Sequence, residues 1–389
     1  MIDRLVAAAG PGCGVMELAS AWSNGGQRLP DWPQFRFGWV TPTHRGRTAI
    51  RLICDLWKLG PGDDVLVPAY NCGTEIDPIV GCGARVVPYR IDENMRFCTQ
   101  EVEQRITPRT KMVYVTHYFG WSHDIDELAA WCRDRCIKVV EDCALRFFRE
   151  PESEGAPLVS DAAIFSFPKW FAVPDGGALV LRERPDMEIR LDRKPRALRI
   201  ARNIAMLMKR RVMGGNRLPW RSGRQPALNG AHCSSGLTSG EELPDMPAEY
   251  YYDSRKHHCR ISTASLRLLH RIQPGTVARR RQANYRCLQS LLTGVAGVTL
   301  VFQNLPSEVC PLGLPVLVQE RPRWIESLHT RGVEAIPWWA GYHRALDWQP
   351  FPEARRLKDH VMVLPVHQDL NEEHMESIAR QVRTVASEL

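Results

Sequence analysis

The chain has 389 residues, a length typical of two domains or of one large α/β domain with a smaller partner. Apolar residues make up 44% and charged residues 24% of the sequence, which allows a sizeable core and excludes wholesale disorder. The formal net charge of +7 is too small at this length to indicate a nucleic-acid partner by itself, and it suits an acidic small-molecule substrate equally well.

The 12 cysteines are scattered along the whole chain. Disulfide frameworks belong to short secreted domains, and the closest pair, Cys132 and Cys136, lacks a matching pair at zinc-site spacing. We expect reduced, mostly buried thiols and no metal site. The N-terminus is a poor signal peptide and no run of about 18 apolar residues occurs, so a cytoplasmic protein is expected.

After an irregular, aromatic-rich start of about forty residues, the first half predicts alternating helices and strands. Apolar residues at helical spacing predict a helix from Thr48 that ends at Gly60. Strands are expected at 65–68, 84–92, 111–120, 137–144, 161–167 and 176–183, with helices at 75–83, 102–107 and 124–136. Continuously apolar strands are typical of a parallel sheet buried on both faces. We therefore expect an α/β fold, with a mostly parallel sheet, helices on both faces and polar residues gathered at the strand ends.

The second half predicts a different organisation. Apolar residues near helical spacing in the basic stretch 190–211 predict a helix, which we expect to be solvated or at a dimer interface in preference to a membrane surface. The Gly/Ser/Pro-rich segment 212–247 is expected to be a long loop. Helices are predicted at 261–272, 277–292, 322–332 and 371–385, and strands at 314–319 and 359–367. We expect a large domain at 1–183, an insertion at 184–247 and a smaller α+β domain at 248–389.

Two chemical signals follow strands of the predicted sheet. Asp142 ends the strand 137–144, where burial raises the pKa of a carboxyl unless a cation lies opposite, although many such residues only cap helices. Lys169 follows the next strand among aromatic residues, a setting that favours the neutral, nucleophilic amine a Schiff-base lysine needs. Ser166, three residues earlier, offers a hydroxyl for a phosphate. A surface lysine beside aromatic neighbours is the alternative.

A third signal is the Gly-Arg-Thr sequence that enters the first predicted helix. Free N–H groups at a helix start, together with Arg47 and the Thr48 hydroxyl, make a possible phosphate site. An ordinary helix capped by Thr48 is the alternative, and the fragment alone favours it.

The order of these signals resembles the fold-type I pyridoxal-phosphate enzymes, and more narrowly the DegT/StrS family of sugar aminotransferases. GPGDDVLVP, VTHYFG, VVEDCA and DGGALV carry the resemblance, which runs from about 43 to 183 and resumes weakly from 259. Each piece is weak alone and their combination is specific. The resemblance implies a homodimer with a shared active site, in which 257–266 reaches the neighbour's cofactor.

The resemblance also implies roles for single residues. Lys169 would bind pyridoxal 5′-phosphate covalently and then act as the acid and base that moves the proton, and Asp142 would pair with the pyridinium nitrogen. Ser166 and the turn Arg47–Thr48–Ala49 would hold the phosphate. Further candidates are Tyr70, Cys72 and His117 at the cofactor, and His343, His367, Trp338 and Trp339 near the substrate.

The chain departs from the family pattern at several of these places. Arg47 stands where a glycine is usual, and Cys72 stands where an aromatic residue stacks on the ring, with Tyr70 two positions earlier. Leu145 replaces a polar residue and cannot hydrogen-bond to the cofactor. Ser166 lies two residues closer to Lys169 than in the common pattern.

The sequence therefore favours an aminotransferase that moves an amino group, usually from glutamate, to a ketone on a nucleotide-linked sugar in polysaccharide or glycoconjugate biosynthesis. Two alternatives stay open. One is other pyridoxal-phosphate chemistry, as in a lyase or a non-sugar transaminase, and the other is a non-catalytic scaffold with the same fold.

Overall fold

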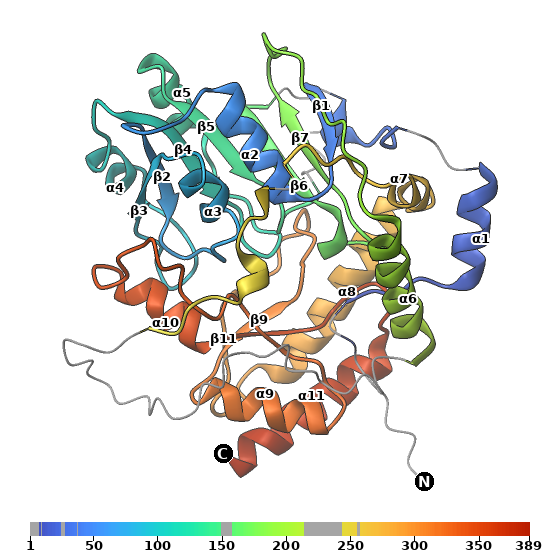
Figure 1. Ribbon diagram of the computed structural model, residues 1–389. Helices are drawn as coiled ribbons and strands as arrows, with labels where there is room; N and C mark the ends of the chain where they lie inside the picture. Colours follow the sequence, from blue (N-terminus) through green and yellow to red (C-terminus); the bar gives the residue numbers. More distant parts are fainter. Residues whose placement is uncertain are drawn as a thin grey trace.

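The computed structural model describes residues 8, 10–24, 28–36, 38–148, 158–213, 243–254 and 257–389. Most of the predicted loop 212–247 lies outside these residues. Two sheets organise the described chain, a large one near its N-terminal half and a small one near its C-terminal half (Figure 1).

The large sheet has seven strands in the order β1-β7-β6-β5-β4-β2-β3. These are β1 (Trp39–Thr43), β2 (Asp64–Pro68), β3 (Arg85–Tyr89), β4 (Thr110–Thr116), β5 (Lys138–Asp142), β6 (Ala162–Ser166) and β7 (Gly177–Leu181). The strands from β3 to β6 in this order pair in parallel, and β7 runs antiparallel to both of its neighbours, β6 and β1. The mostly parallel sheet confirms the prediction. The sequence missed only β1, an edge strand whose Pro42 is tolerated there because an edge position needs no further ladder bond.

Helices cover both faces of this sheet because its apolar strands alternate their side chains. Val65 and Val67 pack with α2 (Gly46–Leu56) and α3 (Ile76–Val80), whereas Leu66 faces the cluster that includes α4 (Thr99–Gln104) and α5 (Asp126–Asp134). Each of these helices lies where the sequence predicted one. The alternation also sends neighbouring residues at a strand end to opposite faces, which decides the placement of the site residues.

A third core cluster joins the N-terminal segment to the loop after β6. Trp32 packs edge-on against Phe147 at a ring-centroid distance of 5.2 Å, and both belong to a buried cluster with Phe167 and Trp170. The helices around it are α1 (Val15–Asn24), α6 (Ala197–Met213), α7 (Thr263–Leu269) and α8 (Pro274–Leu292). The aromatic-rich start of the chain therefore contains a helix and buries the surroundings of Lys169, which the expectation of an irregular segment did not foresee.

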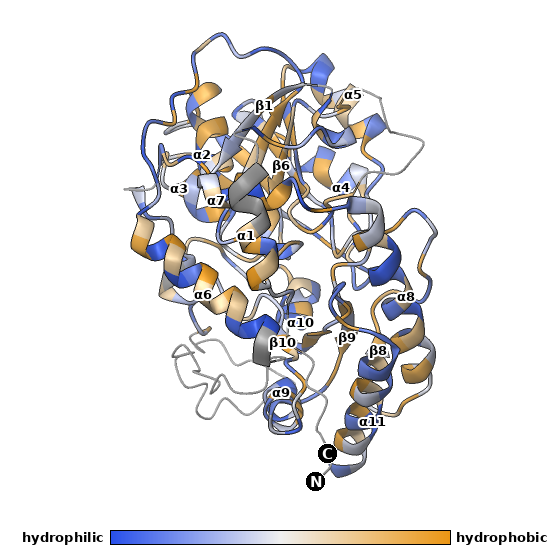
Figure 2. Ribbon diagram, turned by 90° about the vertical axis from the view of Figure 1, so that its right-hand side faces the viewer, coloured by the Kyte–Doolittle hydropathy of each residue, from blue (hydrophilic) through white to orange (hydrophobic). Residues whose placement is uncertain are grey.

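The small sheet is antiparallel, with the order β10-β11-β9-β8. Its strands are β8 (Thr299–Leu300), β9 (Leu314–Leu317), β10 (Ile336–Pro337) and β11 (Val361–Leu364), and its helices are α8, α9 (Arg321–Thr330), α10 (Pro352–His360) and α11 (Glu372–Glu388). Figure 2 shows α8 and α11 running side by side, in agreement with their contacts. A capping box between Asn371 and His374 begins α11. The sequence had not predicted α10.

The cysteines of the described residues are all free thiols, and six of them are buried: Cys13, Cys54, Cys132, Cys143, Cys259 and Cys310. This agrees with the expected reduced thiols, although Cys98 and Cys136 are exposed. Across the described ranges, the helices are all too short or too polar to cross a membrane.

Candidate active site

A cavity of about 560 Å³ lies at the carboxyl ends of β5 and β6, where open α/β sheets bind ligands. Asp142 ends β5, Ser166 ends β6, and Lys169 ends the 3-10 turn Phe167–Lys169 that follows. All three side chains line the cavity, so residues predicted from separate motifs come together.

Asp142 is a buried hydrogen-bond acceptor at the carboxyl end of β5. Its carboxylate accepts hydrogen bonds from the Tyr114 hydroxyl at 2.8 Å and from the Ala144 N–H at 2.8 Å. Burial raises the pKa of Asp142, and the nearby charge of Lys169 opposes this rise. A carboxylate has about four lone-pair positions, so Asp142 can still accept a bond from a cationic N–H group in the cavity.

Lys169 is held in place by the aromatic residues around it. Phe167 and Trp170 are fully buried on either side, and the Trp170 indole donates to the Ala144 carbonyl at 3.0 Å. The Trp170 carbonyl accepts from Arg281 at 3.3 Å and from Gln368 at 3.0 Å. The backbone next to the lysine is thus held by residues far away in the sequence, while Lys169 itself lines the cavity.

The start of α2 closes one end of the cavity. Its N-cap residue, Arg45, makes no side-chain capping bond, and Gly46 lies against Ile164 and Ser166. Helix starts leave N–H groups free, so this end of the cavity attracts an anion. Burial lowers the pKa of both Arg45 and Arg47, which line the same wall, and the Arg47 guanidinium donates to the Tyr250 carbonyl at 3.1 Å. Thr48 and Ala49, in the first turn of the same helix, are buried and do not line the cavity.

Tyr70 and Cys72 take different places. Tyr70 turns into the core, where its ring stacks on Tyr118 at a centroid distance of 5.7 Å. Cys72 lines the cavity, and its thiol is 2.8 Å from Glu75 and 2.7 Å from Thr74. The aromatic residues of the cavity wall are instead Tyr250, Trp338 and Trp339.

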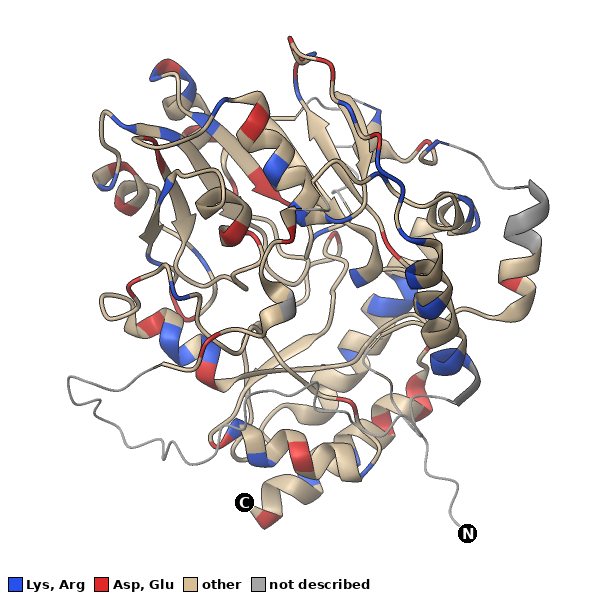
Figure 3. Ribbon diagram, viewed as in Figure 1, with Lys and Arg blue, Asp and Glu red and all other residues tan. Residues whose placement is uncertain are grey.

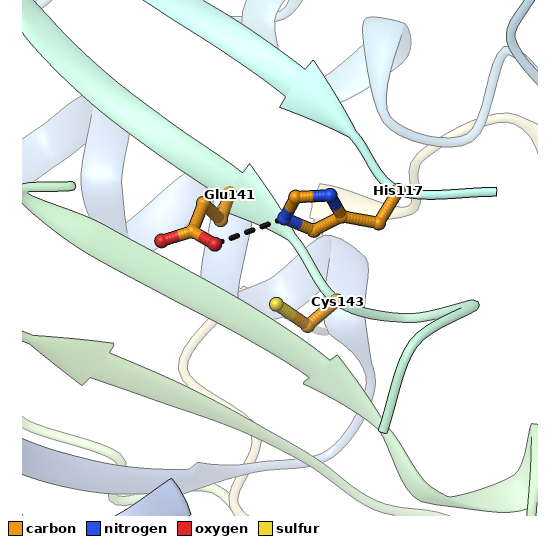
Figure 4. Close-up of side chains that lie close together, drawn as sticks. All are labelled: His117, Glu141 and Cys143. Atoms are coloured by element: carbon orange, nitrogen blue, oxygen red, sulfur yellow. Dashed lines mark hydrogen bonds and ion pairs between the residues drawn. The ribbon is translucent and has the colours of Figure 1, made fainter. Parts of the chain in front are cut away.

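His117 lies away from the cavity, in a buried cluster with Glu141 and Cys143 (Figure 4). Its Nε2 is 2.9 Å from Glu141, and its Nδ1 accepts the N–H of His123 at 3.0 Å. Glu141 precedes Asp142 on β5, so its side chain takes the opposite face of the sheet. The Arg146 guanidinium lies 3.4 Å from Glu141 and 4.0 Å from the Cys143 thiol, so these groups already have a cationic partner and we assign the cluster to structure.

Sequence reasoning did not foresee several lining residues. Arg45 lies two residues before the predicted Arg47, and Glu75 lies three residues after the predicted Cys72. This closeness in sequence was the only sign that either residue lines the cavity. Arg210 comes from α6, the basic helix for which no site was expected. Trp338 and Trp339 do line the cavity, as their sequence had suggested, whereas Leu145 is buried in the core.

Comparison with known proteins agrees with this geometry. Residues 38–199 match the model of the DegT/DnrJ/EryC1/StrS aminotransferase family. This confirms the resemblance over the segment that carries Arg47, Asp142, Ser166 and Lys169. Among curated relatives, the UDP-N-acetyl-3-dehydro-alpha-D-glucosamine 3-aminotransferase of Acidithiobacillus ferrooxidans is 30% identical over 40% of this chain and 42% of its own length. The GDP-perosamine synthase of Vibrio cholerae is 28% identical over 36% of this chain and 39% of its own length. The matched part thus spans less than half of these relatives.

Solved structures extend the likeness of the fold to the whole chain. The aminotransferase TlmJ from Streptoalloteichus hindustanus superposes with a TM-score of 0.67 at 22% identity, covering 100% of this chain and 99% of that one. Helicobacter pylori PseC, an aminotransferase involved in the biosynthesis of pseudoaminic acid, gives 0.67 at 15% identity, covering 99% and 100%. These matches confirm the predicted fold-type I architecture.

Proposed function

We propose that the protein is a pyridoxal-phosphate-dependent aminotransferase that moves an amino group from an amino acid, with glutamate as the expected donor, to the ketone of a nucleotide-linked sugar. The observation that carries the proposal is the convergence of Lys169, Asp142, Ser166 and the start of α2 on one cavity. The curated relatives, which are named as aminotransferases or synthases of amino sugars, support this substrate class.

The residues present fit this cofactor. Asp142 offers a buried acceptor for a protonated ring nitrogen, and the uncapped start of α2, with Arg45, Arg47 and Ser166, suits a phosphate. Lys169 lines the same cavity and offers the amine for the aldehyde carbon. Cys72 occupies the expected stacking position, so contact with the ring there would be made by a thiol without an aromatic face.

The chemistry then divides between the cofactor and the chain. Bound pyridoxal phosphate supplies the electron sink and the carbon that carries the amino group between substrates. Lys169 Nζ takes the proton from the Cα of the donor and returns it during transfer, while Asp142 holds a negative charge beside the ring nitrogen. Trp338, Trp339 and Tyr250 restrict water at the cavity wall. The balanced reaction converts an amino acid and a keto sugar into a 2-oxo acid and an amino sugar.

Two further properties belong to this proposal. We infer a homodimer in which 257–266 reaches the neighbouring active site, and a cytoplasmic location. The mild positive charge of the chain is compatible with a diphosphate-bearing substrate.

The test uses purified protein loaded with pyridoxal phosphate. We expect borohydride to fix the cofactor on Lys169, as read by peptide mass spectrometry, and glutamate alone to yield one equivalent of 2-oxoglutarate per site. Lys169→Ala should abolish both results. Covalent cofactor without any 2-oxo acid from a panel of amino acids would favour other pyridoxal-phosphate chemistry, and absence of cofactor binding would favour a scaffold.

A further inference from the structure

Helix α6 is hydrogen-bonded to the Lys169 loop (residues 167–176, between β6 and β7) and to the N-terminal segment. The Asn203 side chain donates to the Pro174 carbonyl at 2.8 Å, and the Cys13 N–H donates to the Leu207 carbonyl at 3.1 Å. Ile200 of α6 is buried. Figure 3 shows several Lys and Arg positions, in blue, along the ribbon of α6. This basic helix therefore lies at the active site and places charge there.

A second cavity, of about 200 Å³, adjoins the first one. Both cavities are lined by Pro168, Lys169, Arg210, Ile336 and Trp338, so Lys169 and Arg210 stand on their common wall. Most of the remaining lining is apolar and comes from β9, β11 and their flanking residues, among them Leu312, Val363 and Leu364. A volume equal to about seven water molecules has room for a compact molecule and falls below the range of about 300–1,000 Å³ typical of larger ligands.

Most polar groups of this smaller cavity already have partners. Arg281 donates to the Leu312 carbonyl at 2.8 Å and to Gln368 at 2.9 Å. His367 Nε2 is 3.0 Å from the Ala8 carbonyl, and its Nδ1 accepts the Asp369 N–H at 3.3 Å. Glu334 also has an interaction partner.

Arg210 differs from these groups. Within the described residues its guanidinium has no hydrogen-bond or ion-pair partner, whereas the next residue, Arg211, lies 3.8 Å from Asp369. Arg210 is half-buried, so its charge faces a partly dehydrated space. A guanidinium in such a space binds a carboxylate through two parallel hydrogen bonds.

We propose that Arg210 binds the carboxylate of the amino-acid donor and holds it in the smaller cavity beside Lys169. The inference rests on the proposed function, because it assumes that an amino acid reacts at Lys169. The size of the smaller cavity favours an amino acid over a nucleoside diphosphate. The planar guanidinium group of Arg210 can donate two parallel hydrogen bonds to one carboxylate. α6 would then act as a specificity element for the donor.

The experiment compares the wild-type holoenzyme with Arg210→Ala and Arg210→Lys. Arg202→Ala is the matched control, because Arg202 is exposed on the same helix and lines neither cavity. Calorimetric titration uses two unreactive probes, glutarate for the donor carboxylate and uridine diphosphate for the nucleotide. We expect Arg210→Ala to raise the Kd of glutarate about 10- to 100-fold and to leave the Kd of uridine diphosphate unchanged. Arg210→Lys should fall between Ala and wild type, and Arg202→Ala should match wild type.

Three outcomes would overturn the inference. These are no binding of millimolar glutarate by the wild-type holoenzyme, an unchanged Kd of glutarate in Arg210→Ala, and weakening of uridine diphosphate alone, which would assign Arg210 to the nucleotide. Circular dichroism of Arg210→Ala checks folding, and Arg210→Lys provides the comparison if Ala unfolds. Failure of the proposed function looks different, since the wild-type protein would then carry no cofactor on Lys169 or form no 2-oxo acid.

Discussion

At the scale of single residues, neighbours on one strand have separate tasks. Glu141 and Asp142 are adjacent on β5, yet Asp142 lines the cavity and Glu141 bonds to His117 on the other face. The period of two in a strand separates them. Burial raises the pKa of Asp142, whereas partners hold the pKa of Glu141 at about 2 in spite of burial. Adjacent carboxylates thus offer separate tests of function and of stability.

The first test concerns Asp142. We expect Asp142→Asn to keep the cofactor on Lys169 and to lower the rate of 2-oxoglutarate formation about 100-fold or more, because the charge beside the ring nitrogen is lost. Single-turnover absorbance measurements give this rate. Asp134→Asn, at an exposed position of α5, is the matched control and should react at the wild-type rate. Equal rates for Asp142→Asn and wild type would remove Asp142 from the reaction.

The second test concerns Glu141. Burial raises its pKa, but the hydrogen bonds of His117 and Ser160 and the charges of His117 and Arg146 outweigh burial and bring the pKa to about 2, below the ordinary 4.5. A carboxyl whose pKa is lower in the folded state stabilises the fold above pH 4.5, and this stability is lost as the pH falls toward 2. The effect amounts to about 3 kcal/mol.

Urea unfolding at pH 7 and at pH 3.5 measures this contribution of Glu141 to the free energy of unfolding. Glu141→Gln should lower the unfolding free energy at pH 7 and flatten its decrease with acid. Asp64→Asn is a second carboxyl variant for comparison, since Asp64, bonded to Arg85, also has a pKa lowered to about 2. An unchanged acid dependence in Glu141→Gln would contradict the assignment.

At the scale of elements, α8 connects the small sheet to the lysine loop. Arg281 is buried, and burial lowers its pKa to about 10. Its guanidinium donates hydrogen bonds to the carbonyls of Trp170, Pro311 and Leu312 and to the side chain of Gln368. A single side chain therefore joins the residue after Lys169 to the residues just before β9.

We expect Arg281→Ala to destabilise the protein by about 3 kcal/mol, since several buried carbonyls would lose their donor. Guanidinium unfolding of the cofactor-free protein measures this change, and Arg280→Ala, exposed on the same helix, is the control. A loss below about 0.5 kcal/mol would mean that water replaces the guanidinium.

At the scale of the whole molecule, the proposed shared active site depends on the segment 257–266. Within one chain it lies along β1 and the Lys169 loop, since the Cys259 carbonyl accepts the His44 N–H at 3.1 Å and Ser262 donates to Asp175 at 2.5 Å. Arg260 of this segment is exposed and does not line the cavity of its own chain. This placement is compatible with a residue that serves the neighbouring subunit.

If 257–266 completes the neighbour's site, Lys169→Ala and Arg260→Ala should each be inactive alone. Mixing and refolding the two variants together should then recover up to about a quarter of the wild-type activity, because half of the dimers would contain one intact site. Sedimentation velocity verifies the dimer. An inactive mixture of proven heterodimers would argue that each chain builds its site alone.

Local sequence determined much of this protein. Continuous apolar runs specified the parallel strands, helical spacing specified the covering helices, and strand ends next to turns located Asp142, Ser166 and Lys169. These features depend on contacts within a few residues or on periodicity along the chain, so they can be recognised without the fold.

Tertiary structure alone decided the rest. In the folded chain Tyr70 and His117 lie away from the cavity, whereas Cys72 lines it. The face of each element that is buried in the core decides this, and closeness in sequence does not. It also brought Arg210, about 40 residues after Lys169, onto the same cavity wall. No periodicity encodes which face of a helix meets a distant loop. That choice follows from the packing of α6 against the Lys169 loop and the N-terminal segment, which exists only in the folded chain.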